Sequence, residues 1–458
     1  MDWDLEADLV IVGAGLAGYC AALEAAESNA RVLLLEKMRD VGGTSGMSGG
    51  LFAFAGTDLQ RERGIDDGEE RLYDDLRKVG NCANDDALVR IYVKHQLDTY
   101  HWLRNKRVQF GPPEASGGQS VPRSHTTNSA AVIQTLAACA RDAGAITCMT
   151  ETPARRLVRD AGGERVSGVL AMREGREIAI RAKRGVILAA GGFSRNQKLL
   201  ECFAPLQVGV NTVCGKGSTG DGLLMAWKVG AGLRDMAYIK STFGNHPDAG
   251  SERHRILFPV YRGAVAVNRH GWRFVNESLS YKALGDVCAV QPGAIAYQIF
   301  DQTVMDQSSP GVVTFDFEEA LQTGYLLTAE TVADLAHKID IDPQTLGDTI
   351  ERYNGNIARG VADELGRATL SNAFGSLVKL ERPPYYASPS VNVMLGTYCG
   401  ITIDARAQVL DVFDQPIAGL YAAGEIHGGF HGAAYMTGSG LGKAAVFGRL
   451  AAAEALRS

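Results

Sequence analysis

The apolar residues near the N-terminus predict two parallel strands joined by a helix. The run DLVIVG at residues 8–13 is apolar over nearly its whole length, as in a strand that is buried on both faces. The alanine-rich segment at 16–28 predicts a helix, and RVLLLE at 31–36 predicts a second strand that ends in an acidic residue. Together they form a βαβ pattern of about 30 residues.

Later apolar runs predict that distant parts of the chain extend the same sheet. RGVILAAGGFS at 184–194 and GLYAAGEI at 419–426 each predict a strand that ends in a tight turn. STGDGLLMAWKVGA at 218–231 predicts a loop and a helix, and GLGKAAVFGRLAAAEAL at 440–456 predicts a closing helix. We therefore predict an α/β fold with a Rossmann-like domain that is discontinuous in sequence.

Three glycines after the first strand predict a dinucleotide site. Gly13 allows a tight turn, Gly15 lets the backbone approach a pyrophosphate, and Gly18 lets the helix pack closely on the strand. The N-terminus of the helix favours the negative charge of a phosphate. Glu36, at the end of the second strand, can accept hydrogen bonds from a ribose diol.

The segment GGTSGMSGGLFAFAG at 42–56 indicates FAD rather than NAD. A nicotinamide domain normally continues into further strand and helix repeats, whereas here a glycine–serine loop follows the acidic residue. Its backbone N–H groups can bind a diphosphate and a ribityl chain. A flexible linker is the alternative, but Met47, Leu51 and Phe52 would be costly in an exposed linker. The loop contains no histidine, so we expect the FAD to be bound without a covalent link.

Composition and charge exclude several other classes of protein. The 458 residues favour two domains. The net charge of −6 and the lack of a long basic run argue against nucleic acid and anionic membranes as partners. The cysteines form no CxxC motif, so we predict no metal site and a reduced, cytoplasmic protein. The N-terminus is acidic before its apolar run, unlike a signal peptide, and no apolar run is long enough to span a bilayer.

Nearly the whole chain resembles the flavoprotein superfamily of soluble fumarate reductases and 3-ketosteroid dehydrogenases. The resemblance rests on motifs in the same order, namely GAGLAG, GGTSGMSGG, GGQSVPRSH, AAGGF, GSTGDG, NHP, VNRHGWRFVNES, GITIDARAQVLD and GLYAAGE. It implies an FAD-binding domain in two parts, 1–234 and 379–458, with an inserted α+β capping domain at 235–378.

The resemblance also implies which residues bind the cofactor. Glu425 is expected to face the ribityl chain, and the N-terminus of the closing helix is expected to point at the pyrimidine edge of the flavin, where it favours the electron-rich reduced ring. The expected cofactor-binding residues are Gly13, Gly15, Leu16, Ala17, Glu36, Lys37, Gly43, Thr44, Ser45, Gly49, Gly50, Ala154, Ala190, Gly191, Gly192, Thr219, Asp221, Gly424, Glu425, Ser439, Gly440 and Leu441.

The chain departs from the fumarate reductases at three polar positions. Tyr281 and Tyr435 stand where those enzymes carry the proton-donating and carboxylate-binding arginines, and MLGTYCGITID lacks their histidine. His246 is retained in NHP. A dicarboxylate loses its water on entering a closed site, and without a bidentate arginine this loss is not offset. The substitutions therefore disfavour a fumarate-type reaction.

The same positions resemble the ketosteroid branch of the superfamily. YMTGSGLG is similar to the Y-x-S-G-x-S-L-G pattern of 3-ketosteroid Δ4-dehydrogenases, with Thr437 at the place of the first serine, and Tyr281 matches a tyrosine of that group. This resemblance implies desaturation beside a ketone, with the α-proton taken by a tyrosine and the β-hydride taken by flavin N5.

The roles of the two tyrosines stay open at this level. We favour Tyr435 as the base, with Thr437 in a proton relay, Tyr281 in support, and the N–H near Gly440 stabilising the enolate. In the alternative, Tyr281 is the base and Tyr435 binds the carbonyl oxygen. An anionic tyrosine needs a lowered pKa, and His246 and Lys282 are the candidate cations.

Three functions remain in competition. The favoured function is FAD-dependent desaturation of a cyclic ketone. The second is the reverse reaction, which is reduction of an α,β-unsaturated acid or enone. The third is flavin binding without turnover. A cyclohexanone or oxocyclohexane carboxylate is favoured over a 3-ketosteroid as substrate. Arg123 either bonds loop carbonyls or anchors an anionic group. The chain has no haem motif and no second nucleotide fingerprint, so the electron acceptor is unknown.

Overall fold

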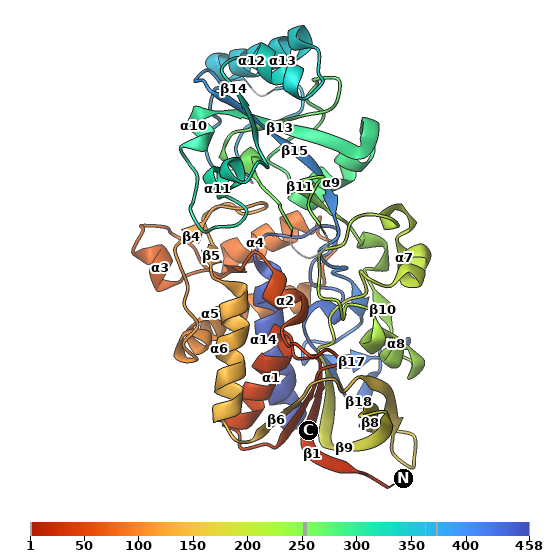
Figure 1. Ribbon diagram of the computed structural model, residues 1–458. Coiled ribbons are helices and arrows are strands. Elements are labelled where there is room, and N and C mark those ends of the chain that lie inside the picture. The colour runs from red at the N-terminus through yellow and green to blue at the C-terminus, as the bar shows by residue number, and fades with distance from the viewer. Residues whose placement is uncertain (1, 251–253, 362, 372–373, 458) are drawn as a thin grey trace.

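The computed structural model describes residues 2–250, 254–361, 363–371 and 374–457. Two hydrophobic cores form around two large sheets, which lie at the lower and upper ends of the molecule in Figure 1. Within the described residues, no helix combines the length and apolar character needed to cross a bilayer.

The lower sheet joins strands from both ends of the chain. Its main order is β17-β18-β9-β1-β2-β6, and β7 and β8 extend it beside β9. The pairs β1–β2, β1–β9 and β9–β18 are parallel and join the strands that the apolar runs predicted, and β6, which was not predicted, pairs in parallel with β2. The strands are β1 (Leu5–Val12), β2 (Val32–Leu35), β6 (Ile146–Met149), β7 (Ala154–Arg159), β8 (Val166–Arg173), β9 (Arg176–Leu188), β17 (Gln408–Leu410) and β18 (Pro416–Ala422).

Long helices cover the lower sheet, and glycine lets two of them approach closely. A Cβ at Gly448 would lie 2.5 Å from the carbonyl oxygen of Ala17, so the first and last helices of this unit pack backbone to backbone. This contact places the N-terminal helix of the unit beside the C-terminal one (Figure 1). The helices of this unit are α1 (Leu16–Glu27), α4 (Glu69–Val79), α5 (Asp86–Asn105), α6 (Ser129–Asp142), α7 (Gln197–Phe203), α8 (Asp221–Lys228) and α14 (Ser439–Arg457).

The predicted glycine–serine loop contains short regular elements. Helix α2 (Gly43–Met47) lies within it, and β3 (Leu51–Ala53) follows in a small antiparallel sheet of order β3-β5-β4. Leu51 and Phe52, two of the apolar residues that argued against a flexible linker, are buried in this region. The remaining elements around it are α3 (Asp58–Arg61), β4 (Pro113–Glu114) and β5 (Ser124–Thr126).

The upper sheet is antiparallel and forms the core of the predicted cap. Its order is β11-β15-β13-β12, with β14 also paired to β15. Because β15 pairs here, this sheet extends beyond the predicted boundary at residue 378. The elements are β11 (Thr242–Asn245), β12 (Val265–Val267), β13 (Ile295–Asp301), β14 (Leu327–Ala329), β15 (Tyr385–Val393), α9 (Tyr281–Ala289), α10 (Gln302–Met305), α11 (Phe317–Gln322), α12 (Val332–Lys338) and α13 (Pro343–Arg359).

Short elements connect the two units. The strands β10 (Leu233–Arg234) and β16 (Gly400–Ile401) pair with each other at the places where the chain enters and leaves the upper unit. Single 3-10 turns complete the structure at η1 (Pro205–Gln207), η2 (Met236–Tyr238), η3 (Pro259–Arg262), η4 (Pro292–Ala294) and η5 (Gly424–Ile426).

Candidate active site

A cavity of about 440 Å³ lies at the carboxyl edge of the lower sheet, against the start of α1. Ligands of open α/β sheets bind at this edge, beyond the ends of the parallel strands. The predicted cofactor residues that line it are Gly13, Gly15, Leu16, Ala17, Glu36, Lys37, Gly43, Thr44, Ser45, Ala154, Ala190, Gly191, Asp221, Gly424 and Glu425.

The three glycines of the fingerprint have different surroundings. A Cβ at Gly13 would lie 2.4 Å from the Ala189 oxygen, and one at Gly18 would lie 1.9 Å from the Gly13 oxygen. At Gly15 the nearest atom to such a Cβ is the Ser45 hydroxyl oxygen at 3.6 Å. The protein itself therefore requires Gly13 and Gly18, whereas Gly15 faces the open space of the cavity. This is the arrangement that a bound pyrophosphate needs.

Hydrogen bonds within the protein orient two charged residues of the cavity, Glu36 and Lys37. The Glu36 carboxylate accepts hydrogen bonds from the N–H groups of Ala14 at 3.0 Å and Met38 at 2.8 Å, which orients it at the end of β2. Lys37 bonds to the Thr219 hydroxyl at 2.5 Å and to Asp221 at 2.7 Å. These bonds link the end of β2 to the start of α8, so Thr219 supports the cavity wall without lining it.

Glu425 also lines this cavity. It accepts a hydrogen bond of 2.8 Å from the Thr397 N–H, and burial raises the pKa of its carboxyl. Gly192 packs on it, since a Cβ there would lie 2.2 Å from the Glu425 carboxylate. Of the remaining predicted cofactor residues, Gly49, Gly50 and Leu441 line an adjoining cavity, and Gly192, Ser439 and Gly440 line neither.

Sequence reasoning missed several residues of the cofactor cavity. The loop at 215–218, Thr152 and Ala444 also line it. The glycines of GKGSTGDG were a usable signal for that loop, because a Cβ at Gly215 would lie 2.7 Å from the Thr44 N–H. Thr152 and Ala444 had no signal in the sequence, since each is a small residue that the fold alone brings to the wall.

The adjoining cavity, of about 110 Å³, lies between the upper unit and the YMTGSGLG segment at 435–442. Thr44 and Met47 line both cavities, so the two spaces are neighbours. The residues that line the smaller one are Thr44, Met47, Ser48, Gly49, Gly50, Leu51, Val213, Thr242, His254, Ile256, Phe258, Tyr281, Thr314, Leu395, Tyr398, Tyr435, Thr437, Gly438 and Leu441.

The structure brings together the two predicted catalytic tyrosines. Tyr281, the first residue of α9, stacks on Phe258 with ring centroids 4.9 Å apart. Its ring lies 5.7 Å from that of Tyr435, and Thr437 lines the same cavity. Burial and the neighbouring Tyr435 hold the pKa of Tyr281 well above its ordinary value, and the Thr437 side chain opposes this rise.

The Tyr435 oxygen is bound at the start of α14. The Gly440 N–H donates a hydrogen bond of 3.1 Å to it. Burial raises the pKa of Tyr435, and the N–H groups of Gly440 and Gly438 act in the opposite direction. The predicted role of the Gly440 N–H as a donor to substrate needs correction, because this N–H is occupied by Tyr435. Its position instead favours a negative charge on the tyrosine oxygen.

The predicted catalytic histidine is not at this cavity. His246 packs against Tyr325 of the upper unit, with ring centroids 4.9 Å apart, and does not line the tyrosine cavity. His254, eight positions later, does line it. The sequence SERHR contained no pattern that distinguished this histidine from His246.

Lys282, the second candidate cation, packs against the ring of a third tyrosine, Tyr398. Its Nζ is 4.4 Å from the centre of the Tyr398 ring and donates a hydrogen bond of 2.8 Å to the Lys240 carbonyl oxygen. It is almost fully buried and does not line the cavity. Burial lowers the pKa of Lys282 to about 7, an effect that the Glu425 charge opposes.

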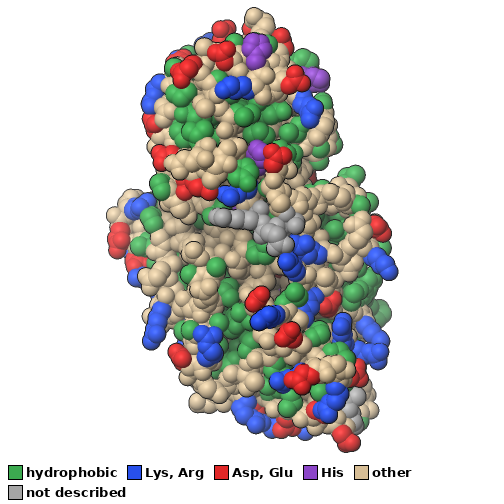
Figure 2. Space-filling view, in the orientation of Figure 1, with side chains coloured by type: hydrophobic (Ala, Val, Ile, Leu, Met, Phe, Trp, Pro, Cys, Tyr) green, Lys and Arg blue, Asp and Glu red, His purple; other side chains and the backbone are tan. Residues whose placement is uncertain are grey.

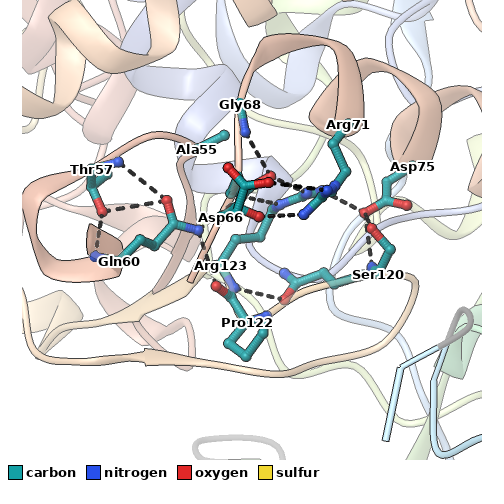
Figure 3. Close-up of polar contacts among 12 residues, drawn as sticks. Ala55, Thr57, Gln60, Asp66, Gly68, Arg71, Asp75, Ser120, Pro122 and Arg123 are labelled. Carbon is teal, nitrogen blue, oxygen red and sulfur yellow. Dashed lines mark hydrogen bonds and ion pairs between the residues drawn. The ribbon is translucent and has the colours of Figure 1, made fainter. Parts of the chain in front are cut away.

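Arg123 has neither of its predicted roles. Its guanidinium bonds to Asp75 at 2.6 Å and to Asp67 at 2.7 and 3.0 Å, and it is fully enclosed. Figure 3 shows Arg123 beside Asp75, whose carboxylate also accepts from Ser120. Because two carboxylates of the protein neutralise it, Arg123 cannot anchor a carboxylate of the substrate.

Acidification is expected to weaken the fold through His125, which is buried beside Arg123. Burial lowers the pKa of His125 to about 4, whereas an unfolded histidine titrates near 6.5. The unfolded chain therefore gains a proton first, and stability present above pH 6.5 is lost as the pH falls toward 4. We expect a loss of about 2 kcal/mol by pH 5 from this group. Urea unfolding should show a smaller pH dependence in His125→Gln, and an equal dependence would contradict this assignment.

The parallel sheet, the glycine cradle at α1 and the adjoining cavity lined by tyrosines are those of an FAD-dependent oxidoreductase. Residues 8–441 match the family described as FAD binding domain, and the chain belongs to that family. FAD is therefore its cofactor. Within the described residues no group of three or more His, Cys, Asp or Glu side chains is arranged to hold a metal ion.

Named relatives are similar over nearly the whole chain. A urocanate reductase of Eggerthella lenta is 33% identical over 98% of this chain and 74% of its own length. A fumarate reductase (cytochrome) of Shewanella frigidimarina is 32% identical over 98% of this chain and 77% of its own. The structure of a 3-ketosteroid-Δ4-(5α)-dehydrogenase from Rhodococcus jostii RHA1 has a TM-score of 0.79 and 25% identity, covering 100% of this chain and 98% of that one. The oxidoreductase thus belongs to the fumarate reductase group of flavoproteins.

Proposed function

We propose that this protein catalyses the FAD-dependent α,β-dehydrogenation of a cyclic ketone. The observation that carries the proposal is the lining of the small cavity, which contains Tyr281, Tyr398 and Tyr435. No arginine or lysine lines it in the part of the chain that the structure describes. An uncharged polar oxygen is therefore better matched to this cavity than a carboxylate, whose desolvation would not be offset.

The cofactor supplies the redox chemistry, since a bound flavin accepts a hydride at its N5 atom. The residues of the chain handle the proton. Tyr435, whose oxygen accepts from the Gly440 N–H, is the proposed base for the proton on the carbon next to the ketone. Tyr281 and Thr437 stand beside it and are the proposed relay to solvent.

The size of the cavity supports a compact ring. At about 110 Å³ it suits a cyclohexanone-sized molecule better than a steroid. The enclosure of Arg123 also removes the residue that would have held an oxocyclohexane carboxylate. We therefore propose a neutral ring ketone as substrate.

Reduction is the second candidate, and the relatives favour it. A urocanate reductase and a fumarate reductase are among the proteins most similar to this chain. The same cofactor and proton relay serve either direction, so the electron partner decides which one operates. A reductase would here act on an enone in preference to a dicarboxylate, for the electrostatic reason given above.

An anaerobic flavin assay distinguishes these functions. The oxidised holoprotein is mixed with cyclohexanone and with larger saturated ring ketones, and the flavin absorbance is followed. Bleaching supports dehydrogenation, and the fastest bleaching is expected with the smaller rings. If only the dithionite-reduced protein reacts, and only with an enone or enoate, the protein is a reductase. If neither form reacts, the proposed function is wrong and a flavin-binding role without turnover is favoured.

A further inference from the structure

A third tyrosine of the small cavity has no assigned role. Tyr398 lies between β15 and β16 and adopts a positive φ of 55°. A non-glycine residue in this region is strained, and such strain persists only where the surroundings impose it. Here the Thr397 N–H is bound to Glu425, and Gly400 packs against the Ile426 carbonyl. These two contacts fix the backbone on both sides of Tyr398.

The ring of Tyr398 is held as firmly as its backbone. It lies 4.8 Å from the ring of Tyr435 and 5.4 Å from that of His431, which it meets edge to face. The amine of Lys282 lies 4.4 Å from the ring centre. These contacts orient the phenol without engaging its oxygen.

The Tyr398 hydroxyl itself is unengaged. Among the residues that the structure describes, none forms a hydrogen bond with it, although the side chain lines the cavity. Burial and the nearby Tyr435 and Glu425 hold the pKa of Tyr398 well above its ordinary value, so the hydroxyl keeps its proton. Tyr398 thus places a hydrogen-bond donor in the wall of the cavity, and no described residue accepts from it.

Tyr435, by contrast, has an oxygen that already accepts a backbone N–H. The two neighbouring phenols therefore differ, because the Tyr435 oxygen accepts a hydrogen bond from the backbone, whereas the Tyr398 hydroxyl keeps its hydrogen for donation. Removal of an α-proton needs both functions close together, since the α-carbon and the carbonyl oxygen of a ketone are two bonds apart. The Gly440 N–H, the donor expected from the sequence, is not free for this task.

We propose that Tyr398 is the catalytic residue that donates a hydrogen bond to the carbonyl oxygen of the ring substrate, with Lys282 and His431 holding its ring in place. This inference rests on the proposed function, because it requires a ketone or enone in the small cavity. It assigns polarisation of the carbonyl to Tyr398 and proton abstraction to Tyr435. The bond involved is a hydrogen bond only, and the hydride and proton of the reaction go to the flavin and Tyr435 as before.

Binding of 2-cyclohexenone to the oxidised holoprotein tests the proposal without turnover. The shift of the flavin visible bands gives the dissociation constant, and the infrared C=O stretch of the bound, carbonyl-labelled probe reports the hydrogen bond. In Tyr398→Phe we expect the dissociation constant to rise about tenfold or more and the C=O stretch to return toward its value in apolar solvent. Cyclohexene, which has no oxygen, should bind to both proteins equally.

The matched control is Tyr325→Phe, which removes a phenol outside the small cavity, where the ring contacts His246 and Arg255. It should bind 2-cyclohexenone as the unaltered protein does. An unchanged dissociation constant and C=O stretch in Tyr398→Phe would overturn the role of Tyr398 and leave the proposed function standing. Absence of 2-cyclohexenone binding to the unaltered holoprotein would overturn both.

Discussion

Tyr435→Phe is expected to lower the rate of flavin reduction by a saturated ring ketone roughly 10²–10⁴-fold, the usual contribution of a positioned general base. The substitution removes a phenol oxygen of the cavity that accepts a hydrogen bond from the N-terminus of α14. The ring stays in place, because its contacts with Tyr281, Tyr398 and His431 do not involve the hydroxyl. FAD content should therefore be unchanged, and stopped-flow absorbance would measure the rate.

The variant Tyr281→Phe tests whether Tyr435 or Tyr281 is the base. If Tyr435 is the base and Tyr281 only relays its proton, the loss in Tyr281→Phe should be smaller and most evident in the pH dependence of the rate. A larger loss in Tyr281→Phe than in Tyr435→Phe would reverse the assignment. Near-normal rates in both variants would remove the tyrosine mechanism altogether.

Gly18→Ala is expected to prevent stable folding and FAD binding, whereas Gly15→Ala should affect FAD binding alone. The new methyl group at position 18 would stand 1.9 Å from the Gly13 oxygen, so α1 would have to move away from the end of β1. We expect a cost of about 3 kcal/mol or more, at the upper end of overpacking effects. At position 15 the methyl group meets no protein atom closer than 3.6 Å and occupies space left for the cofactor.

Unfolding of the apoprotein in urea and titration with FAD measure these two effects separately. Gly15→Ala should unfold as the unaltered apoprotein does but bind FAD at least about tenfold more weakly. Gly46→Ala is the control in the neighbouring α2, because its methyl group would make an ordinary contact of 3.8 Å with Ile133. Equal FAD affinity in Gly15→Ala and the unaltered protein would show that the cofactor does not approach this part of α1.

Local patterns were sufficient to predict the first βαβ unit and the cofactor. The apolar strand, the alanine-rich helix and the glycine spacing each depend on residues close in sequence, and the structure confirms β1, α1 and β2 in that order. FAD binding is confirmed by the family to which the chain belongs. The surface in Figure 2 carries interspersed positive and negative side chains on the face shown.

Contacts between distant segments account for what the sequence did not predict. Arg123 was left with two roles because nothing near it in sequence showed that Asp67 and Asp75, 56 and 48 positions away, would enclose it. His246 was predicted as the catalytic histidine, whereas His254 lines the small cavity, and nothing in the sequence near either residue showed this. Tyr398 was overlooked because its importance comes from the neighbours that the fold brings to it.

The amino-acid sequence by itself determined the class of this protein: an α/β flavoprotein whose glycines, acidic strand end and closing helix are laid out for FAD. It also predicted Tyr281 and Tyr435 as residues of the candidate active site. Only the tertiary structure decided how the phenols differ, with one oxygen bound to a helix N-terminus and another left free to donate. The reason is physical, since hydrogen-bond partners and burial depend on which distant segments the fold brings into contact, and residue spacing alone does not specify these contacts.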